Sequence, residues 1–132
     1  MIIYTDASYR LIREKKEKIK TGKICFILDN QKPVIKILQL KEIKGLKQYN
    51  NIFELWAVLE ALKATKAKRI EVFTDSQVVY FWLRRGGSLD NSWKHKQLKD
   101  DIEEIKRKLS FSIQWIPREQ NKAGIFLEKE EN

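Results

Sequence analysis

Three short apolar runs in succession constrain the fold of this chain more than any other feature of its sequence. Each run is rich in β-branched or aromatic residues and is too short for a typical helix, so each predicts a β-strand. The runs are Ile2 to Ser8, Lys23 to Asp29 and Val34 to Leu40. Because consecutive strands joined by short turns run in opposite directions, the three predict an antiparallel meander.

The rest of the sequence alternates between helical and strand-like patterns. Apolar residues recur at helical spacing from Ile52 to Leu62, directly after the pair Asn50-Asn51. The further predicted elements are a strand from Arg69 to Thr74, helices from Gln77 to Leu83 and from Ser92 to Leu109, a strand from Phe111 to Ile116 and a final helix from Lys122. Strands separated by a helix run parallel, which makes the sheet mixed. The 132 residues therefore predict one α/β domain over 1–132, a five-stranded mixed sheet with helices on both faces in the order β-β-β-α-β-α-α-β-α.

The chain is strongly basic, with 27 Lys and Arg residues against 18 Asp and Glu residues, a net charge of +9 and a pI near 9.6. Such a charge favours a polyanionic partner, most commonly nucleic acid. The stretch from Arg10 to Lys20 is rich in basic residues, and we interpret it as a flexible basic hairpin tip that closes at Thr21-Gly22. The alternative for this stretch is a solvated loop that binds nothing.

Several classes of protein are excluded by composition. A single cysteine, Cys25, allows no disulfide within the chain and no thiolate metal site, and a single histidine, His95, excludes zinc sites that need two or more. No apolar run approaches the roughly 20 residues of a membrane span, and the N-terminus has no secretory pattern. We therefore expect a cytoplasmic protein in a reducing compartment, without a membrane partner.

Three carboxylates stand in apolar surroundings, unlike the other acidic residues. Asp6 lies inside the first predicted strand, Glu54 lies in the most apolar helix, and Asp75 ends a strand rich in apolar residues. A buried carboxylate without a partner costs several kcal/mol, and no Arg or Lys in these segments is placed to neutralise it. Hard oxygen ligands favour Mg²⁺ or Mn²⁺. Taken one by one, Asp75 is explained as a helix cap and Asp6 as a turn residue, but the three together favour a metal site.

Four segments, in this order, resemble ribonuclease H. They are Thr5-Asp6-Ala7-Ser8, Asn50-Asn51-Ile52-Phe53-Glu54, Phe73-Thr74-Asp75-Ser76-Gln77 and Trp115-Ile116-Pro117-Arg118-Glu119-Gln120-Asn121. The resemblance spans nearly the whole chain and implies the ribonuclease H-like fold.

The resemblance implies a nuclease that cleaves the RNA strand of RNA–DNA hybrids with two cations, Mg²⁺ or Mn²⁺, roughly 3.5–4 Å apart. It places Asp6 near both ions, with Glu54 and Asp75 on one side each. The pair Asn50-Asn51 matches positions that contact ribose 2′-hydroxyls, the groups that distinguish RNA from DNA. Ser8 and Asn121 are further candidate substrate contacts. We expect a monomer, and duplex RNA stays open as a second substrate.

The last helix departs from the family pattern. That pattern has an Asp four residues after the loop Asn, and here the position is Ile125. Glu128 lies three residues later on nearly the same helix face and is a candidate fourth ligand. The alternative is that Glu128 belongs to an acidic surface tail.

The loop before this helix lacks the histidine found in many members of the family. Arg118 is the candidate substitute as a fixed cation near the scissile phosphate, and a surface arginine is the alternative. The family's extended basic protrusion is also absent, since only Arg84-Arg85-Gly86-Gly87 and Ser92-Trp93-Lys94 stand between the helices. We expect Arg84, Arg85 and Lys94 to bind substrate in its place.

The missing fourth carboxylate leaves other functions open. The first is a nucleic-acid-binding module with the fold but a weakened site. The second is a relative that acts on DNA, against which the Asn50-Asn51 pair argues. The third is a basic structural protein, which would leave the three carboxylates unexplained.

Overall fold

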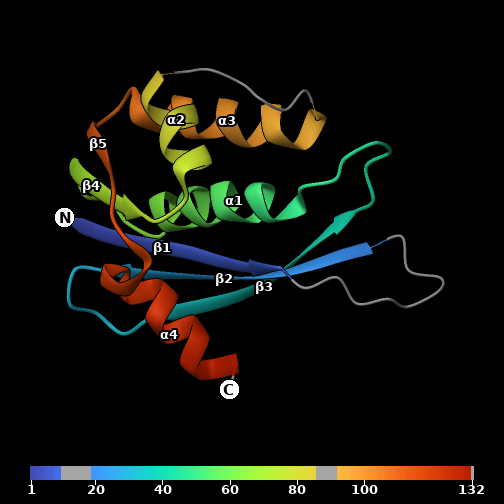
Figure 1. Cartoon of the computed structure of the whole chain (residues 1–132). Coiled ribbons are helices and arrows are strands. Elements are labelled where there is room, and N and C mark those ends of the chain that lie inside the picture. Colours follow the sequence, from blue (N-terminus) through green and yellow to red (C-terminus); the bar gives the residue numbers. More distant parts are fainter. Residues whose placement is uncertain (10–18, 86–91, 132) are drawn as a thin grey trace.

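The computed structural model describes residues 1–9, 19–85 and 92–131, and Figure 1 shows the arrangement of the chain. The strands are β1 (Ile2–Tyr9), β2 (Ile19–Leu28), β3 (Val34–Lys41), β4 (Arg69–Thr74) and β5 (Ser110–Trp115). The helices are α1 (Tyr49–Lys63), α2 (Gln77–Arg85), α3 (Trp93–Lys106) and α4 (Lys122–Glu131), and a short 3₁₀ helix, η1 (Arg118–Gln120), precedes α4. Within the described residues, no helix is long and apolar enough to cross a membrane.

The five strands form one mixed sheet in the order β3-β2-β1-β4-β5. The first three strands pair antiparallel, whereas β4 runs parallel to both β1 and β5. Helices α1, α2 and α3 lie on one face of the sheet and α4 lies on the other (Figure 1). The predicted fold class and element order are therefore confirmed, with η1 as an addition.

The main core lies between the sheet and α1. This helix has apolar residues on almost all sides, and ten of its residues are buried. The fully buried positions include Ile52, Phe53, Leu55 and Val58, which pack against Ile3 and Ile24 of the sheet. Burying the α1 side chains between β1, β2 and α3 fixes the helix across the middle of the sheet.

A second, smaller core holds α4 against the opposite face. Ala123 and Leu127 of α4 pack on Cys25 and Ile27 of β2. Because Cys25 pairs with Asp6 in the antiparallel register, this packing places the first turns of α4 beside Asp6.

The predicted hairpin closure at Thr21-Gly22 is wrong, because β2 already begins at Ile19 and both residues lie within it. Gly22 serves close packing instead of a turn. A Cβ added there would lie 2.5 Å from the ring of Phe53, so only glycine lets α1 approach β2 this closely. The tip itself, over residues 10–18, lies outside the described residues. The sequence also predicts that the pair Gly86-Gly87 stops the second helix, and this pair lies outside the described residues as well.

Several helix boundaries also differ from the prediction. Helix α2 ends at Arg85 and not at Leu83. Helix α1 begins at Tyr49, so Asn50 and Asn51 lie in its first turn and do not precede it. The third predicted helix, Ser92 to Leu109, is shorter as α3: Ser92 is its N-cap, with its side chain accepting from the His95 backbone N–H, and it ends at Lys106.

Candidate active site

Two neighbouring parallel strands carry Asp6 and Asp75 to the same edge of the molecule. Tyr4 of β1 lies opposite Phe73 of β4, and each acidic residue follows two positions later. Asp6 lies within β1, paired with Cys25, and is not a turn residue. Asp75 follows the last residue of β4.

The capping role considered for Asp75 is filled by its neighbours. The Ser76 hydroxyl accepts a hydrogen bond from the Val79 backbone N–H at 3.2 Å, and the Thr74 hydroxyl accepts one from the Ser76 backbone N–H at 3.1 Å. These two bonds satisfy the start of α2. The Asp75 carboxylate is therefore not needed to cap α2.

Glu54 completes the cluster from the second turn of α1. One oxygen from each of Asp6, Glu54 and Asp75 lies within 4.8 Å of the others, and Asp6 and Glu54 are buried. Glu54 is only 6% exposed, and its Oε2 has no hydrogen-bond partner among the described residues. Buried carboxylates normally find a donor, so this oxygen has the environment of a metal-ligand atom. The residues present fit a hard divalent cation, which would bind oxygen ligands of this kind.

Burial suppresses the ionisation of all three carboxylates, and neighbouring negative charges add to this effect at Asp6 and Glu54. Burial, followed by the charge of Asp75, raises the pKa of Asp6 from 3.8 to about 6. Burial and the charges of Asp6 and Asp75 raise the pKa of Glu54 well above its ordinary value. Burial also raises the pKa of Asp75, an effect opposed by a hydrogen bond from Asn121 and by the positive charge of Arg118. A divalent cation would reverse this balance by stabilising the ionised forms.

Asn121 ties the start of α4 to the strand that carries Asp6. It is fully buried, its amide nitrogen donates to the Thr5 carbonyl at 2.9 Å, and its amide oxygen accepts from the Ala123 backbone N–H at 3.2 Å. With its amide engaged inside the protein, Asn121 is placed to position the site, whereas the sequence suggested a substrate contact.

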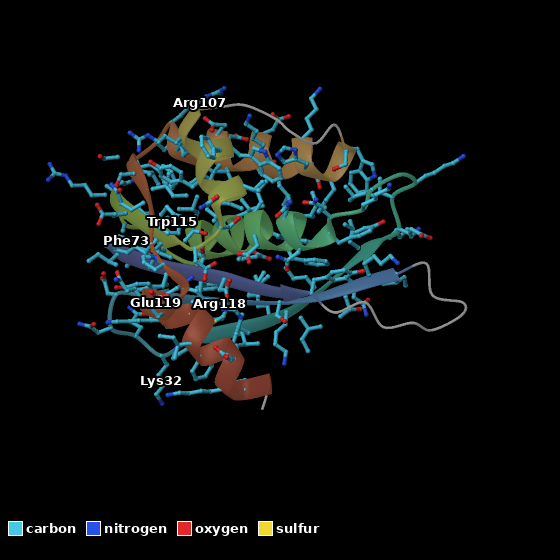
Figure 2. The ribbon with its side chains drawn as sticks, in the orientation of Figure 1. Lys32, Phe73, Arg107, Trp115, Arg118 and Glu119 are labelled. Carbon is cyan, nitrogen blue, oxygen red and sulfur yellow. The ribbon has the colours of Figure 1, made fainter. Side chains whose placement is uncertain are left out.

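The cluster opens into a cavity of about 340 Å³ that several predicted residues line. Its wall includes Asp6, Ser8, Asn50, Glu54, Asp75, Arg118 and Glu128. Arg118 opens η1 at the junction of β5 and α4, where Figure 2 labels it beside Glu119. The positive charge of Arg118 lowers the pKa of both Asp6 and Asp75, against the effect of burial.

Other predicted residues lie apart from this cavity. The Asn51 amide donates to the Gln48 side chain at 2.8 Å. Lys94 lies over the Trp56 ring at 4.0 Å and donates to Gln97 at 3.0 Å, and burial lowers its pKa. The exposed Arg84 side chain donates to the Tyr80 hydroxyl. Arg85 ends α2, and its side chain lies outside the described part of the structure.

Four residues near the site are not among the predicted site residues. Tyr9 and Gly124 line the cavity, and Ser76 both lines it and caps α2. The Trp115 indole N–H donates to the Asp75 carbonyl at 3.1 Å, which ties β5 to the residue that holds the carboxylate. Only Ser76 had a usable signal, as a serine directly before a predicted helix.

Comparison with known proteins agrees with this fold. The sequence model of the RNase H family matches residues 1–124. A search of curated proteins finds no sequence that matches the chain.

Solved structures of ribonucleases H superpose on nearly the whole chain. RNase H1 from the archaeon Halobacterium salinarum has a TM-score of 0.65 and 20% identity, and covers 96% of this chain and 92% of its own. LC11-RNase H1 in complex with an RNA/DNA hybrid has a TM-score of 0.62 and 19% identity, and covers 99% of both chains. The N-terminal RNase H domain of a Mycobacterium tuberculosis protein has a TM-score of 0.66 and 14% identity, over 96% of this chain and 93% of that chain.

The fold together with the match over residues 1–124 defines the class: the chain belongs to the RNase H family. It is a ribonuclease H enzyme by class, as its sequence motifs indicated.

Proposed function

We propose that this protein is an active, divalent-cation-dependent endonuclease that cleaves the RNA strand of RNA–DNA hybrids. The observation that carries the proposal is the cluster of Asp6, Glu54 and Asp75, in which the buried Oε2 of Glu54 has no hydrogen-bond partner among the described residues. A structural carboxylate cluster would be satisfied by internal donors. A set of cation ligands, by contrast, would keep carboxylate oxygens without internal donors, as this cluster does.

Asp6, Glu54 and Asp75 would together hold two Mg²⁺ or Mn²⁺ ions. Bound there, the cations would supply activation of water and stabilisation of the leaving 3′ oxygen of the RNA. The chain's own contribution is to fix the three carboxylates on β1, α1 and the end of β4 before substrate arrives. Arg118 would contact the scissile phosphate as a permanent cation.

Residues around the cavity would select the substrate. Asn50 is exposed on the first turn of α1 and lines the cavity, and Ser8 lines it from β1. We propose that Asn50 contacts ribose 2′-hydroxyls, with Asn51 supporting it through Gln48. The hybrid bound in the LC11-RNase H1 complex supports an RNA–DNA hybrid as the substrate here.

Basic residues outside the cavity would bind the phosphates of the nucleic-acid backbone. The net charge of +9 favours a polyanion, and we propose phosphate contacts for Arg84, Arg85 and Lys94. Duplex RNA is a second substrate to test.

A second candidate function is a binding module that no longer cleaves. The favouring observation is Ile125, which occupies the family's fourth carboxylate position and cannot bind a cation. The intact cluster of three carboxylates speaks against this candidate.

Cleavage of end-labelled RNA–DNA hybrid, duplex RNA and duplex DNA, each with Mg²⁺, with Mn²⁺ and with chelator, tests the proposal. We expect cation-dependent cleavage of the RNA strand of the hybrid, and loss of nearly all activity in Asp75→Asn. The exposed Asp100 of α3 offers the control Asp100→Asn, which should match the wild type. Hybrid binding without cleavage under every condition would support the binding module instead.

A comparison of Asn50→Ala and Asn51→Ala tests substrate choice. Asn50→Ala should weaken cleavage of RNA-containing substrates more than Asn51→Ala does, because only the first side chain lines the cavity. An equal loss of binding to hybrid and to duplex DNA would argue against recognition of the 2′-hydroxyl.

A further inference from the structure

A glycine of α4, Gly124, lies directly beside the carboxylate cluster. A Cβ added to Gly124 would lie 2.9 Å from Oδ2 of Asp6 and 3.6 Å from Oδ2 of Asp75. The first distance is too short for a carbon beside an oxygen, so position 124 accepts no side chain while Asp6 holds this place. The absent side chain leaves the helix surface open beside both carboxylates.

Glu128 lies one helical turn beyond Gly124, on the same face of α4. Side chains on a helix lean toward its N-terminus and cover the preceding turn, which for Glu128 is the turn that contains Gly124. Both residues line the cavity that contains Asp6, Glu54 and Asp75. Since Glu128 is exposed, its carboxylate is free to turn inward over the glycine.

Ile125 occupies a different place on this helix. It is 36% exposed, and the described wall of the cavity includes Gly124, Leu127 and Glu128 but not Ile125. The face of α4 turned toward the cluster therefore carries positions 124 and 128.

The charges of the site provide an independent reason for a fourth carboxylate. Asp6, Glu54 and Asp75 together carry at most three negative charges, whereas two divalent cations carry four positive ones. Glu128 would balance the cation pair. Arg118, which also lines the cavity, would then be matched by a substrate phosphate.

We propose that Gly124 and Glu128 together replace the missing carboxylate: Gly124 leaves the space, and the Glu128 carboxylate uses it to join Asp6 and Asp75 in holding a divalent cation. This inference rests on the proposed function for the nature of the site, and it adds a ligand from a helical position where the family pattern has none.

The test is the Mn²⁺ affinity of the protein without substrate, measured by isothermal titration calorimetry at pH 7.5. Glu128→Gln should weaken binding about tenfold or more, the loss typical of a disturbed metal site. Glu128→Asp keeps the charge but shortens the side chain, and should weaken binding at least threefold. Glu130→Gln, another exposed residue of α4, is the matched control and should bind as the wild type does. Thermal unfolding in chelator checks that all variants are folded.

Each outcome bears on the inference. Wild-type affinity in Glu128→Gln overturns it. A loss in Glu128→Gln with wild-type affinity in Glu128→Asp also overturns it, because charge would then suffice without contact. If the hybrid is not cleaved but Glu128→Gln and Glu128→Asp still lose affinity, the inference stands and the proposed function falls. Absence of Mn²⁺ binding by the wild type overturns both.

Discussion

Neutralising Asp6 should stabilise the protein in the absence of cations, although it removes a residue of the proposed catalytic site. The carboxyl is only 7% exposed, and its pKa is raised from 3.8 to about 6. The folded protein therefore binds more protons than the unfolded chain between about pH 4 and 6, and stability falls as the pH rises through this window. Asp6→Asn removes the group responsible.

The shift of about two pKa units corresponds to about 3 kcal/mol at neutral pH, at about 1.4 kcal/mol per unit. Asn loses some of the hydrogen bonding that Asp6 has with Glu54 and the Ala7 backbone, which costs about 1 kcal/mol. The expected net gain is therefore about 2 kcal/mol at pH 7.5, or roughly 6–8 °C in Tm for a domain of this size. At pH 4.5 most of the penalty is absent, so the gain should vanish.

Urea denaturation in chelator, followed by circular dichroism at pH 7.5 and pH 4.5, measures both values. Asp100→Asn on the exposed face of α3 is the control and should show no pH-dependent gain. An Asp6→Asn protein no more stable than the wild type at pH 7.5, or equally stabilised at both pH values, would refute the reasoning that buried, mutually repelling carboxylates strain the cluster.

Three further predictions follow from the packing and charge of the chain. Asn121→Ala removes the hydrogen bond to the Thr5 carbonyl and should lower the free energy of unfolding, measured by urea titration, by about 1–3 kcal/mol. Cleavage should fall as well. An unchanged stability would contradict the positioning role of Asn121. Gly124→Ala should lower cleavage at least tenfold while the fold is kept, because the added methyl group displaces the Asp6 carboxylate. Ile125→Asp should change activity less than threefold, because position 125 does not line the cavity. A large gain of activity in Ile125→Asp would mean that the fourth ligand is missing. Hybrid affinity, measured by fluorescence anisotropy, should fall at least tenfold between about 50 and 200 mM salt, and a flat response would contradict phosphate-dominated binding.

The element order was predictable because local signals agree with the fold almost everywhere. Most strands are short apolar runs, and Glu54 is the one charged residue among the ten buried residues of α1. The prediction of a hairpin closure at Gly22 was wrong because glycine occurs both in turns and at sites of close packing, and the sequence does not distinguish the two. Gly22 packs against Phe53, which lies 31 residues later in the chain. A contact between positions so far apart cannot be read from the local sequence pattern.

The carboxylate cluster was predictable for a related reason. Asp6, Glu54 and Asp75 each interrupt an apolar segment. A buried charge is costly without a partner, so the sequence alone indicates that these three residues have a role beyond packing. The neighbours that shape the site gave no such signal. Gly124 matters through its distance to Asp6, and Asn121 through its burial, and both follow from the docking of α4 on β1 and β2.

The location of the bound cation tests the central claim most directly. Crystals soaked in Mn²⁺ can be measured near the manganese absorption edge, where the anomalous signal marks the metal alone. The account predicts anomalous peaks among the carboxylates of Asp6, Glu54 and Asp75, and loss of these peaks in Glu54→Gln crystals. A cluster without manganese, with peaks only at other surface carboxylates, would contradict it.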